Sequence, residues 1–323
     1  MYIWGIDISD WQNDPEAIPW DVFYEHGCRW VTVKCSMGYG PSDYVDQHVE
    51  CIRRKAPKML IGLYHWDDPT ATASSQAYFF ADKIRTLQPD FWCQDDEQWW
   101  ANWPKYWAYI RKEIPASEVP RLSGSRIANT YNAVRDEIYK LGYVEMENLV
   151  YTARWFTRGY SPELAEAIIG RPQWIADYRA CRHFAIADLC LNANASYWKV
   201  TWEEFEYLLE MCYRVIEGRD GIDPKWLPYM PDGSWIAPDL IFWQIDSKEW
   251  LPGAPGRLDV NIFFANDETI LLQYFGIEEP QPEPEPDPDT IEELRQDVDE
   301  LYDEVNDLRK IVLERGDYLR HTP

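Results

Sequence analysis

Four short apolar segments recur at a nearly constant spacing in the first hundred residues. Each is brief, rich in β-branched or aromatic residues and bounded by polar residues or by Gly and Pro, as buried strands are. Equivalent positions on these segments lie 27, 30 and 31 residues apart, about the length of one β-α-β unit, at Asp7, Lys34, Tyr64 and Asp95. The segments are 2–9, 30–36, 59–66 and 90–96, with helical patterns at 44–56 and 71–86. This period predicts a parallel α/β barrel.

The pattern continues along the chain. Further strands are predicted at 148–153, 172–178, 240–246 and 257–263, and further helices at 126–141 and 202–216. The 323 residues suit one large barrel, predicted over 1–277, plus an appendage. Trp-rich residues 99–121 interrupt the period after the fourth strand and are either a lid or groove wall, or surface padding against a neighbouring helix.

The sequence changes character after the barrel. Residues 278–289 alternate Pro with acidic residues, which favours an extended, semi-rigid linker. A capping-box pattern then starts a helix predicted over 290–316, followed by a tail at 317–323. Apolar residues repeat at steps of three and four across 291–312, with β-branched residues at a and Leu at d. This predicts a homo-oligomer, with a parallel two-stranded coiled coil favoured, and the alternative is a single helix that docks on the barrel.

Charge and cysteine content exclude several classes of protein. The net charge of −25 argues against nucleic acid or an anionic membrane as a partner. The N-terminus lacks a signal-peptide pattern and no apolar run suits membrane insertion, so synthesis as a soluble cytoplasmic product is expected. Seven cysteines without CxxC spacing are expected to be reduced core thiols, and we predict no metal and no cofactor.

An acidic cluster stands at the end of the fourth predicted strand. Residues two apart on a strand share a face, so Asp95 and Glu97 should project together and Asp96 the other way. At the carboxyl end of a barrel, that shared direction is into the mouth. Two close carboxyls in a cleft cannot both ionise freely, so one pKa rises and that group can act as a general acid. Glycosidic bond cleavage needs such an acid.

Two more acids interrupt apolar strand patterns. Asp7 ends the first strand and Asp259 lies in the last. A buried acid needs a partner or a function. Each either contributes to a site or accepts hydrogen bonds from a loop, and the residues alone leave both readings open.

Nine motifs resemble, in order, those of the glycoside hydrolase family 25 muramidases over about residues 3–265. They are "GIDISDWQ" (5–12), "VKCSMG" (33–38), "GLYHW" (62–66), "SQAYFF" (75–80), "QDDE" (94–97), "VYTARWF" (150–156), "WIADY" (174–178), "FWQIDS" (242–247) and "LDVNIF" (258–263). The resemblance implies a modified TIM-like β/α barrel that cleaves the β-1,4 bond after N-acetylmuramic acid in bacterial peptidoglycan.

The resemblance also implies roles for individual residues. Glu97 would be the general acid, and Asp95 would orient the substrate acetamido group, which attacks the anomeric carbon in place of an enzyme nucleophile. Asp7 and Asp259 would complete the acidic rim. The implied groove aromatics and further substrate contacts are Tyr64, Tyr151, Trp174, Tyr178, Gln12, Lys34 and Trp243. The sequence departs from the family where Met37 replaces a usual acid, and the insertion at 99–121 is longer than usual.

Several alternatives stay open. The barrel is either an active lysin, released through a holin or mounted on a virion, or an inactive glycan-binding or structural module. Another aminosugar polymer such as chitin is a third substrate class. Inverting chemistry with Asp7 or Asp259 as base also remains, and a separation of about 6.5–9.5 Å between the carboxyls would favour it.

Overall fold

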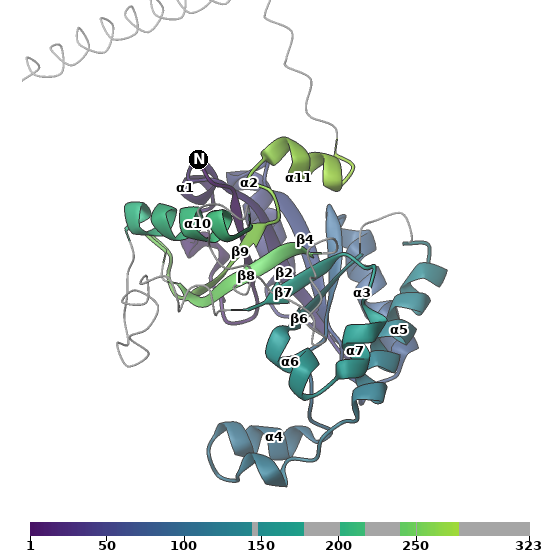
Figure 1. Ribbon diagram of the computed structural model, residues 1–323. Coiled ribbons are helices and arrows are strands. Elements are labelled where there is room, and N and C mark those ends of the chain that lie inside the picture. Colours follow the sequence, from purple (N-terminus) through teal and green to yellow (C-terminus); the bar gives the residue numbers. More distant parts are fainter. Residues whose placement is uncertain (144–147, 178–200, 217–239, 250, 278–323) are drawn as a thin grey trace, which may run out of the picture. The chain divides into compact units, whose positions relative to one another are not determined.

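The computed structural model describes residues 1–143, 148–177, 201–216, 240–249 and 251–277 (Figure 1). Met1–Ile277 form one compact unit. The predicted linker, coiled-coil helix and tail lie outside the described residues, as does Tyr178.

Eight strands close into a barrel. In spatial order they are β1 (Trp4–Ile8), β9 (Leu258–Phe263), β8 (Leu240–Glu249), β7 (Gln173–Ala176), β6 (Asn148–Ala153), β5 (Phe91–Asp95), β4 (Leu60–Trp66) and β2 (Cys28–Met37), and β2 pairs again with β1. The short β3 (Gly40–Pro41) folds back on the end of β2. The predicted α/β barrel is therefore confirmed, and each predicted strand is present.

The last strand corrects the prediction of an all-parallel sheet. β9 runs antiparallel to both of its neighbours, whereas the other seven strands of the barrel are parallel. Parallel neighbours need a crossover of a dozen or more residues, and only residues 250–257 separate β8 from β9. The reversal brings the start of β9 to the carboxyl ends of the parallel strands, where Asp259 pairs in register with Asp7.

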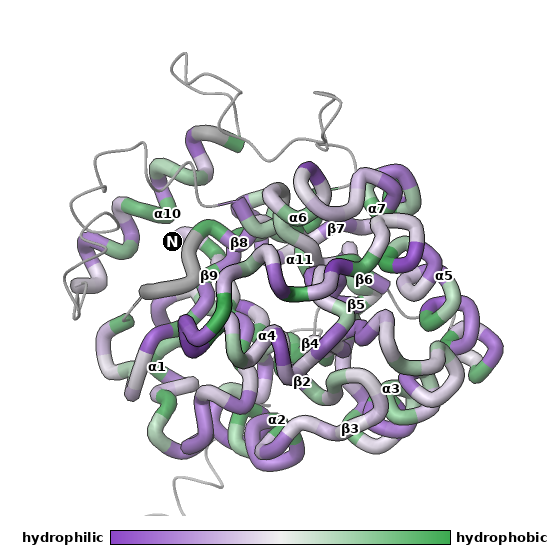
Figure 2. Tube along the Cα trace, turned by 90° about the horizontal axis from the view of Figure 1, so that it is seen from below, coloured by the Kyte–Doolittle hydropathy of each residue, from purple (hydrophilic) through white to green (hydrophobic). Residues whose placement is uncertain are grey.

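Helices surround the strands (Figure 2). They are α1 (Trp20–Glu25), α2 (Val45–Lys55), α3 (Ala73–Leu87), α4 (Trp103–Ile110), α5 (Gly124–Lys140), α6 (Arg154–Gly159), α7 (Pro162–Ala167), α10 (Trp202–Ile216) and α11 (Glu268–Tyr274), with 3-10 turns η1 (Pro15–Ala17) and η2 (Ala116–Glu118). The four predicted helices correspond to α2, α3, α5 and α10. The hydroxyls of Thr72 and Ser123 each accept a free backbone N–H of the first turn, from Ser75 in α3 and from Arg126 in α5, which explains where these two helices begin.

Aromatic rings fill the end of the barrel at which the parallel strands begin. The Trp30 and Phe242 rings stack with centroids 4.6 Å apart, and Phe91 lies 5.7 Å from Phe242. Gly5 and Gly62 make room for these rings, because a Cβ at either position would come within 2.2 and 2.3 Å of Trp30 and Phe91 respectively.

One end of the barrel is closed. Phe275, directly after α11, stacks on Phe91 at the start of β5 with centroids 4.5 Å apart. The open end, here called the mouth, therefore lies at the carboxyl ends of the parallel strands. In Figure 1, α11 and α4 lie at opposite ends of the barrel.

The five cysteines in the described ranges are buried free thiols, as predicted for core residues. They are Cys28, Cys35, Cys51, Cys93 and Cys212, and the other two lie outside those ranges. In the same part of the chain, no helix is long and apolar enough to cross a membrane.

Candidate active site

Four carboxyl groups meet at the mouth around one tyrosine. Tyr64 is only 8% exposed near the end of β4. The pKa of its phenol is raised well above the usual value, first by burial and then by four carboxylate charges, which belong to Asp7, Asp95, Asp259 and Glu97. Residues from β1, β4, β5 and β9 are therefore brought together, as the sequence predicts for this set.

Asp7 is held by two amides. Its Oδ2 accepts hydrogen bonds from Gln244 Nε2 at 2.9 Å and Asn261 Nδ2 at 2.8 Å. Burial raises the pKa of Asp7 to about 6, although these bonds and one with Asp259 act in the opposite direction. Asp7 is thus a fixed carboxyl that titrates close to neutral pH.

Asp95 and Glu97 both have raised pKa values. Burial raises the pKa of Glu97 to about 7, with a further increase from Asp7 and a decrease from Lys34. Burial, followed by the charge of Glu97, raises the pKa of Asp95 well above its usual value. Two such coupled carboxyls titrate as a pair, so together they keep a proton near neutral pH.

The two carboxyls differ in access. Asp95 is 4% exposed, whereas Glu97 is partly open to solvent. Among the described residues, no donor forms a hydrogen bond with Asp95 Oδ1. An unpaired buried oxygen is costly, so this atom is suited to receive a donor from a ligand.

Asp96 belongs to a different environment. The pKa of Asp96 is raised well above its usual value by burial and then by Asp67, and burial raises the pKa of Asp67 to about 7. Gln94 Nε2 donates to Asp67 Oδ2 at 2.9 Å and to the Tyr131 carbonyl of α5 at 3.1 Å. Asp96 therefore joins a polar layer between the barrel and α5, on the side that the strand alternation predicts.

This buried acid pair predicts a pH-dependent stability. A carboxyl with a raised pKa in the folded state favours folding at low pH and loses that contribution as pH rises, for Asp67 from about 4 through about 7. Asp96→Asn replaces one of the two buried carboxyls with an amide, which cannot ionise and always carries N–H donors. We expect the variant to be more stable than wild type at pH 8, by on the order of 1–2 kcal/mol, with a smaller difference at pH 5. Urea unfolding at both pH values measures this, and an equal difference at both would contradict it.

Two of the implied groove aromatics support the amides that hold Asp7. The Tyr151 hydroxyl donates to Gln244 Oε1 at 3.0 Å, and the Trp174 indole N–H donates to Asn261 Oδ1 at 2.7 Å. The two rings lie 4.7 Å apart in an edge-to-face arrangement. Trp174 is 2% exposed, so in this structure it lies beneath the mouth and orients Asn261.

Lys34 and Gln12 lie at the edges of the mouth. The Lys34 ammonium stands over the Trp66 ring, 5.1 Å from its centroid, and its charge lowers the pKa values of Asp95 and Glu97. Gln12 accepts from the Ser9 backbone N–H at 2.8 Å and donates to the Arg257 carbonyl at 3.1 Å.

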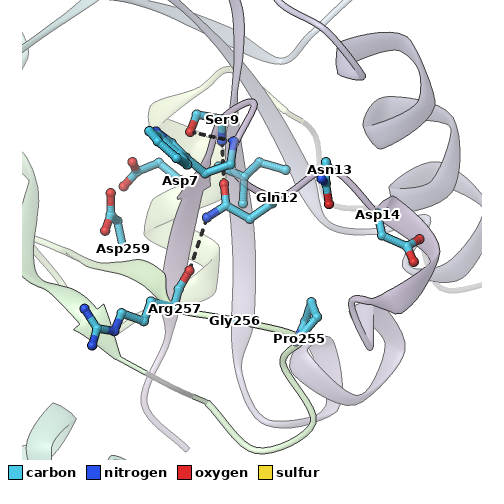
Figure 3. A pocket seen from close by; sticks show the side chains of 11 residues that line it. Asp7, Ser9, Gln12, Asn13, Asp14, Pro255, Gly256, Arg257 and Asp259 are labelled. Carbon is cyan, nitrogen blue, oxygen red and sulfur yellow. Dashed lines mark hydrogen bonds between the residues drawn. The ribbon is translucent and has the colours of Figure 1, made fainter. Parts of the chain in front are cut away.

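A pocket of about 550 Å³ lies beside Asp7 and Asp259 and is lined by residues of the segments 7–14 and 255–259 (Figure 3). Asp7 and Asp259 lie side by side at one side of it, and the Gln12 side chain points into it. The exposed Arg257 brings a positive charge to a wall that is otherwise acidic or neutral. The pocket is therefore open enough for a ligand to reach Asp7.

Trp243 is not placed with the acids. Its indole N–H donates to the Asp177 carbonyl at 2.8 Å, and it is 1% exposed. Side chains alternate along β8, so Trp243 faces the opposite way from Gln244, which binds Asp7.

The sequence analysis missed two residues of the site, Gln244 and Asn261. Asn261 is two positions from Asp259 on β9, and Gln244 is two positions from the core ring Phe242 on β8. A polar amide on the inward face of a buried strand is a signal that could have identified both.

Comparisons with known proteins identify the family of the chain. The family model described as glycosyl hydrolases family 25 matches residues 6–204, more than half of the chain. No curated protein matches the sequence.

Solved structures share the fold. A bacterial lysozyme from Streptomyces coelicolor is 16% identical with a TM-score of 0.53, and the match covers 86% of this chain and 99% of that one. A family 25 glycosyl hydrolase from Bacillus anthracis is 16% identical with a TM-score of 0.51, covering 86% and 94%. The catalytic domain of endolysin ply40 from bacteriophage P40 of Listeria monocytogenes is 14% identical with a TM-score of 0.50, covering 85% and 98%. The chain belongs to glycosyl hydrolases family 25.

Proposed function

We propose that the protein is a muramidase that cleaves the β-1,4 bond between N-acetylmuramic acid and N-acetylglucosamine in bacterial peptidoglycan. The observation that carries this proposal is the pair formed by Asp95 and Glu97 at the barrel mouth, where burial raises the pKa of Glu97 to about 7. A carboxyl with that pKa holds a proton often enough at neutral pH to protonate a leaving oxygen. Family membership and the lysozyme and endolysin names of the structural neighbours support the same substrate class.

Glu97 is the proposed general acid. It is partly open to solvent and lies two residues after the end of β5, so a glycosidic oxygen can approach it from the mouth. Protonation of this oxygen turns a poor leaving group into an alcohol.

Asp95 is proposed to act on the substrate acetamido group. An N–H donated to its unpaired Oδ1 would orient the acetamido oxygen toward the anomeric carbon, which it attacks in place of an enzyme nucleophile. The Asp95 carboxylate would then stabilise the positive charge that forms on this group. This route retains the anomeric configuration.

In this proposal, substrate binding decides whether Asp95 or Glu97 holds the proton that the pair keeps near neutral pH. Without substrate, both carboxyls have raised pKa values. A hydrogen bond from the acetamido N–H favours the ionised form of Asp95, and the proton is then held by Glu97. The pair is therefore set for acid catalysis only when the correct aminosugar is present.

Asp7 and Asp259 complete the proposed acidic rim. Asp7 is fixed by Gln244 and Asn261, so its orientation does not depend on the substrate. We propose that it binds sugar hydroxyls or positions the water of the second step, and that Tyr64 and Tyr151 border the sugar in the mouth.

Product analysis tests the proposed function. Purified protein is expected to clear bacterial wall suspensions and to leave N-acetylmuramic acid at the new reducing ends with retained configuration. Products that end in N-acetylglucosamine, or cleavage of chitin in preference to peptidoglycan, would contradict the muramidase assignment. An inverted product would instead implicate Asp7 or Asp259 as a base acting on water.

A further inference from the structure

We propose that the insertion at 99–121 forms an additional glycan-binding subsite, in which Trp103 and Trp107 on α4 stack on sugar rings of the strand that enters the mouth. The inference rests on the proposed function, because the ligand is a longer part of the same glycan. Trp66, Trp100, Trp103, Tyr106 and Trp107 are here called the aromatic wall.

The insertion lies next to the acids. It begins two residues after Glu97, and α4 lies beyond the carboxyl ends of the parallel strands, away from α11 (Figure 1). The charge of Glu97 adds to burial in raising the pKa of the Tyr106 phenol. The inner side of α4 is therefore within electrostatic reach of the proposed general acid.

The rings of the aromatic wall form a continuous series from the mouth outward. Lys34 covers Trp66, whose ring centroid lies 6.2 Å from that of Trp100. Trp100 and Tyr106 stack with centroids 3.5 Å apart and an interplanar angle of 5°. Trp103 and Trp107 follow at the outer end, with centroids 6.3 Å apart and planes 29° from parallel.

The wall is anchored on both sides. Asn102 caps α4 by accepting the Lys105 backbone N–H, and the Trp103 indole N–H donates to Asp68 Oδ2 at 3.3 Å. Trp99 packs on Tyr160 with centroids 5.2 Å apart, and the Arg121 guanidinium lies over both rings. A surface held in this way loses little freedom when a ligand binds.

The outer end of the wall is exposed although its base is buried. Trp107 is 46% and Ile110 47% exposed, whereas Trp99 and Trp100 are 7% and 3% exposed. The buried rings pack in the interior of the insertion, whereas Trp107 and Ile110, one helical turn apart, form an exposed apolar surface of the kind that marks binding sites. Sugars present flat C–H faces to aromatic rings and hydroxyls to solvent, which suits an open indole surface continuous with the mouth.

Binding by a catalytically blocked chain tests the subsite. In a Glu97→Gln background, Trp107→Ala is expected to weaken binding to peptide-free peptidoglycan glycan strands about three- to tenfold, while Trp107→Phe keeps most of the affinity. Tyr78→Ala on α3 is the matched control, because Tyr78 is 66% exposed and outside the aromatic wall. Isothermal titration measures the affinities.

Kinetics separate this inference from the proposed function. With Glu97 intact, Trp107→Ala should raise KM for long glycan strands about three- to tenfold and leave kcat, and the cleavage of a tetrasaccharide, unchanged. Equal affinity of the Trp107→Ala and Tyr78→Ala chains, or equal losses on long and short substrates, would overturn the subsite. A chain with intact Glu97 that cleaves neither substrate would overturn the proposed function, and the binding comparison would still decide the subsite.

Discussion

Glu97→Gln is expected to lower kcat/KM on peptidoglycan by about 10²- to 10⁴-fold, the range that a general acid contributes. Glutamine has nearly the same shape but has no proton to transfer to the leaving oxygen. Turbidity clearing and release of reducing ends measure the loss. In the wild type, the rate should fall as pH rises above about 7, because Glu97 loses the proton that the reaction requires.

The leaving group makes this prediction specific. The leaving group of an aryl glycoside with an acidic phenol departs as the phenolate, without protonation. Glu97→Gln should therefore lose far less activity on that substrate than on peptidoglycan. Asp96→Asn is the matched control, because it makes the same chemical change one residue away in the layer that contains Asp67. Clearing that survives Glu97→Gln would remove Glu97 from the mechanism.

Asp95→Asn is expected to lower kcat by about 10²- to 10³-fold, as the loss of one preorganised electrostatic group does. The amide can still contact the substrate, but it carries no charge to stabilise the developing positive charge on the acetamido group. The Michaelis kinetics of the purified variant should show the loss in kcat with a smaller change in KM.

The aryl glycoside also distinguishes Asp95 from Glu97. The acetamido oxygen displaces the leaving group in one step on either substrate, forming its bond to the anomeric carbon as the bond to the leaving oxygen breaks. Asp95→Asn should therefore lose similar activity on the aryl glycoside and on peptidoglycan. The alkaline limb of the pH profile should also move to lower pH, because Glu97 loses the charge of Asp95 and keeps only that of Asp7 as a negative neighbour. A loss confined to peptidoglycan would indicate that Asp95 acts on the leaving group instead.

Local patterns predicted most of the barrel. The interval of about 30 residues between buried strands reflects the length of one β-α-β unit, and it recurs in β1, β2, β4 and β5. The strand predicted at 148–153 coincides with β6, a run of six buried residues. Alternation along β5 likewise predicted that Asp95 faces the mouth and Asp96 the helices, since this depends only on the strand period.

Other features depend on contacts between distant segments. β9 reverses direction because its link to β8 is too short for a crossover, and this brings Asp259 opposite Asp7. Trp243 faces the outside of the barrel, although its motif suggested a substrate contact. Gln244 and Asn261 bind Asp7 from 237 and 254 residues away, a relation that no local pattern contains.

By itself, the sequence determined which residues alternate on each strand, where the acids stand in the strand period and where the insertion interrupts it. These depend on neighbouring side chains and on the two-residue repeat of a strand. Only the tertiary structure decided how far the acids are withdrawn from water, which partners hold them and where the aromatic wall lies. Desolvation and charge interactions depend on distances through space, and closure of the barrel is what sets those distances.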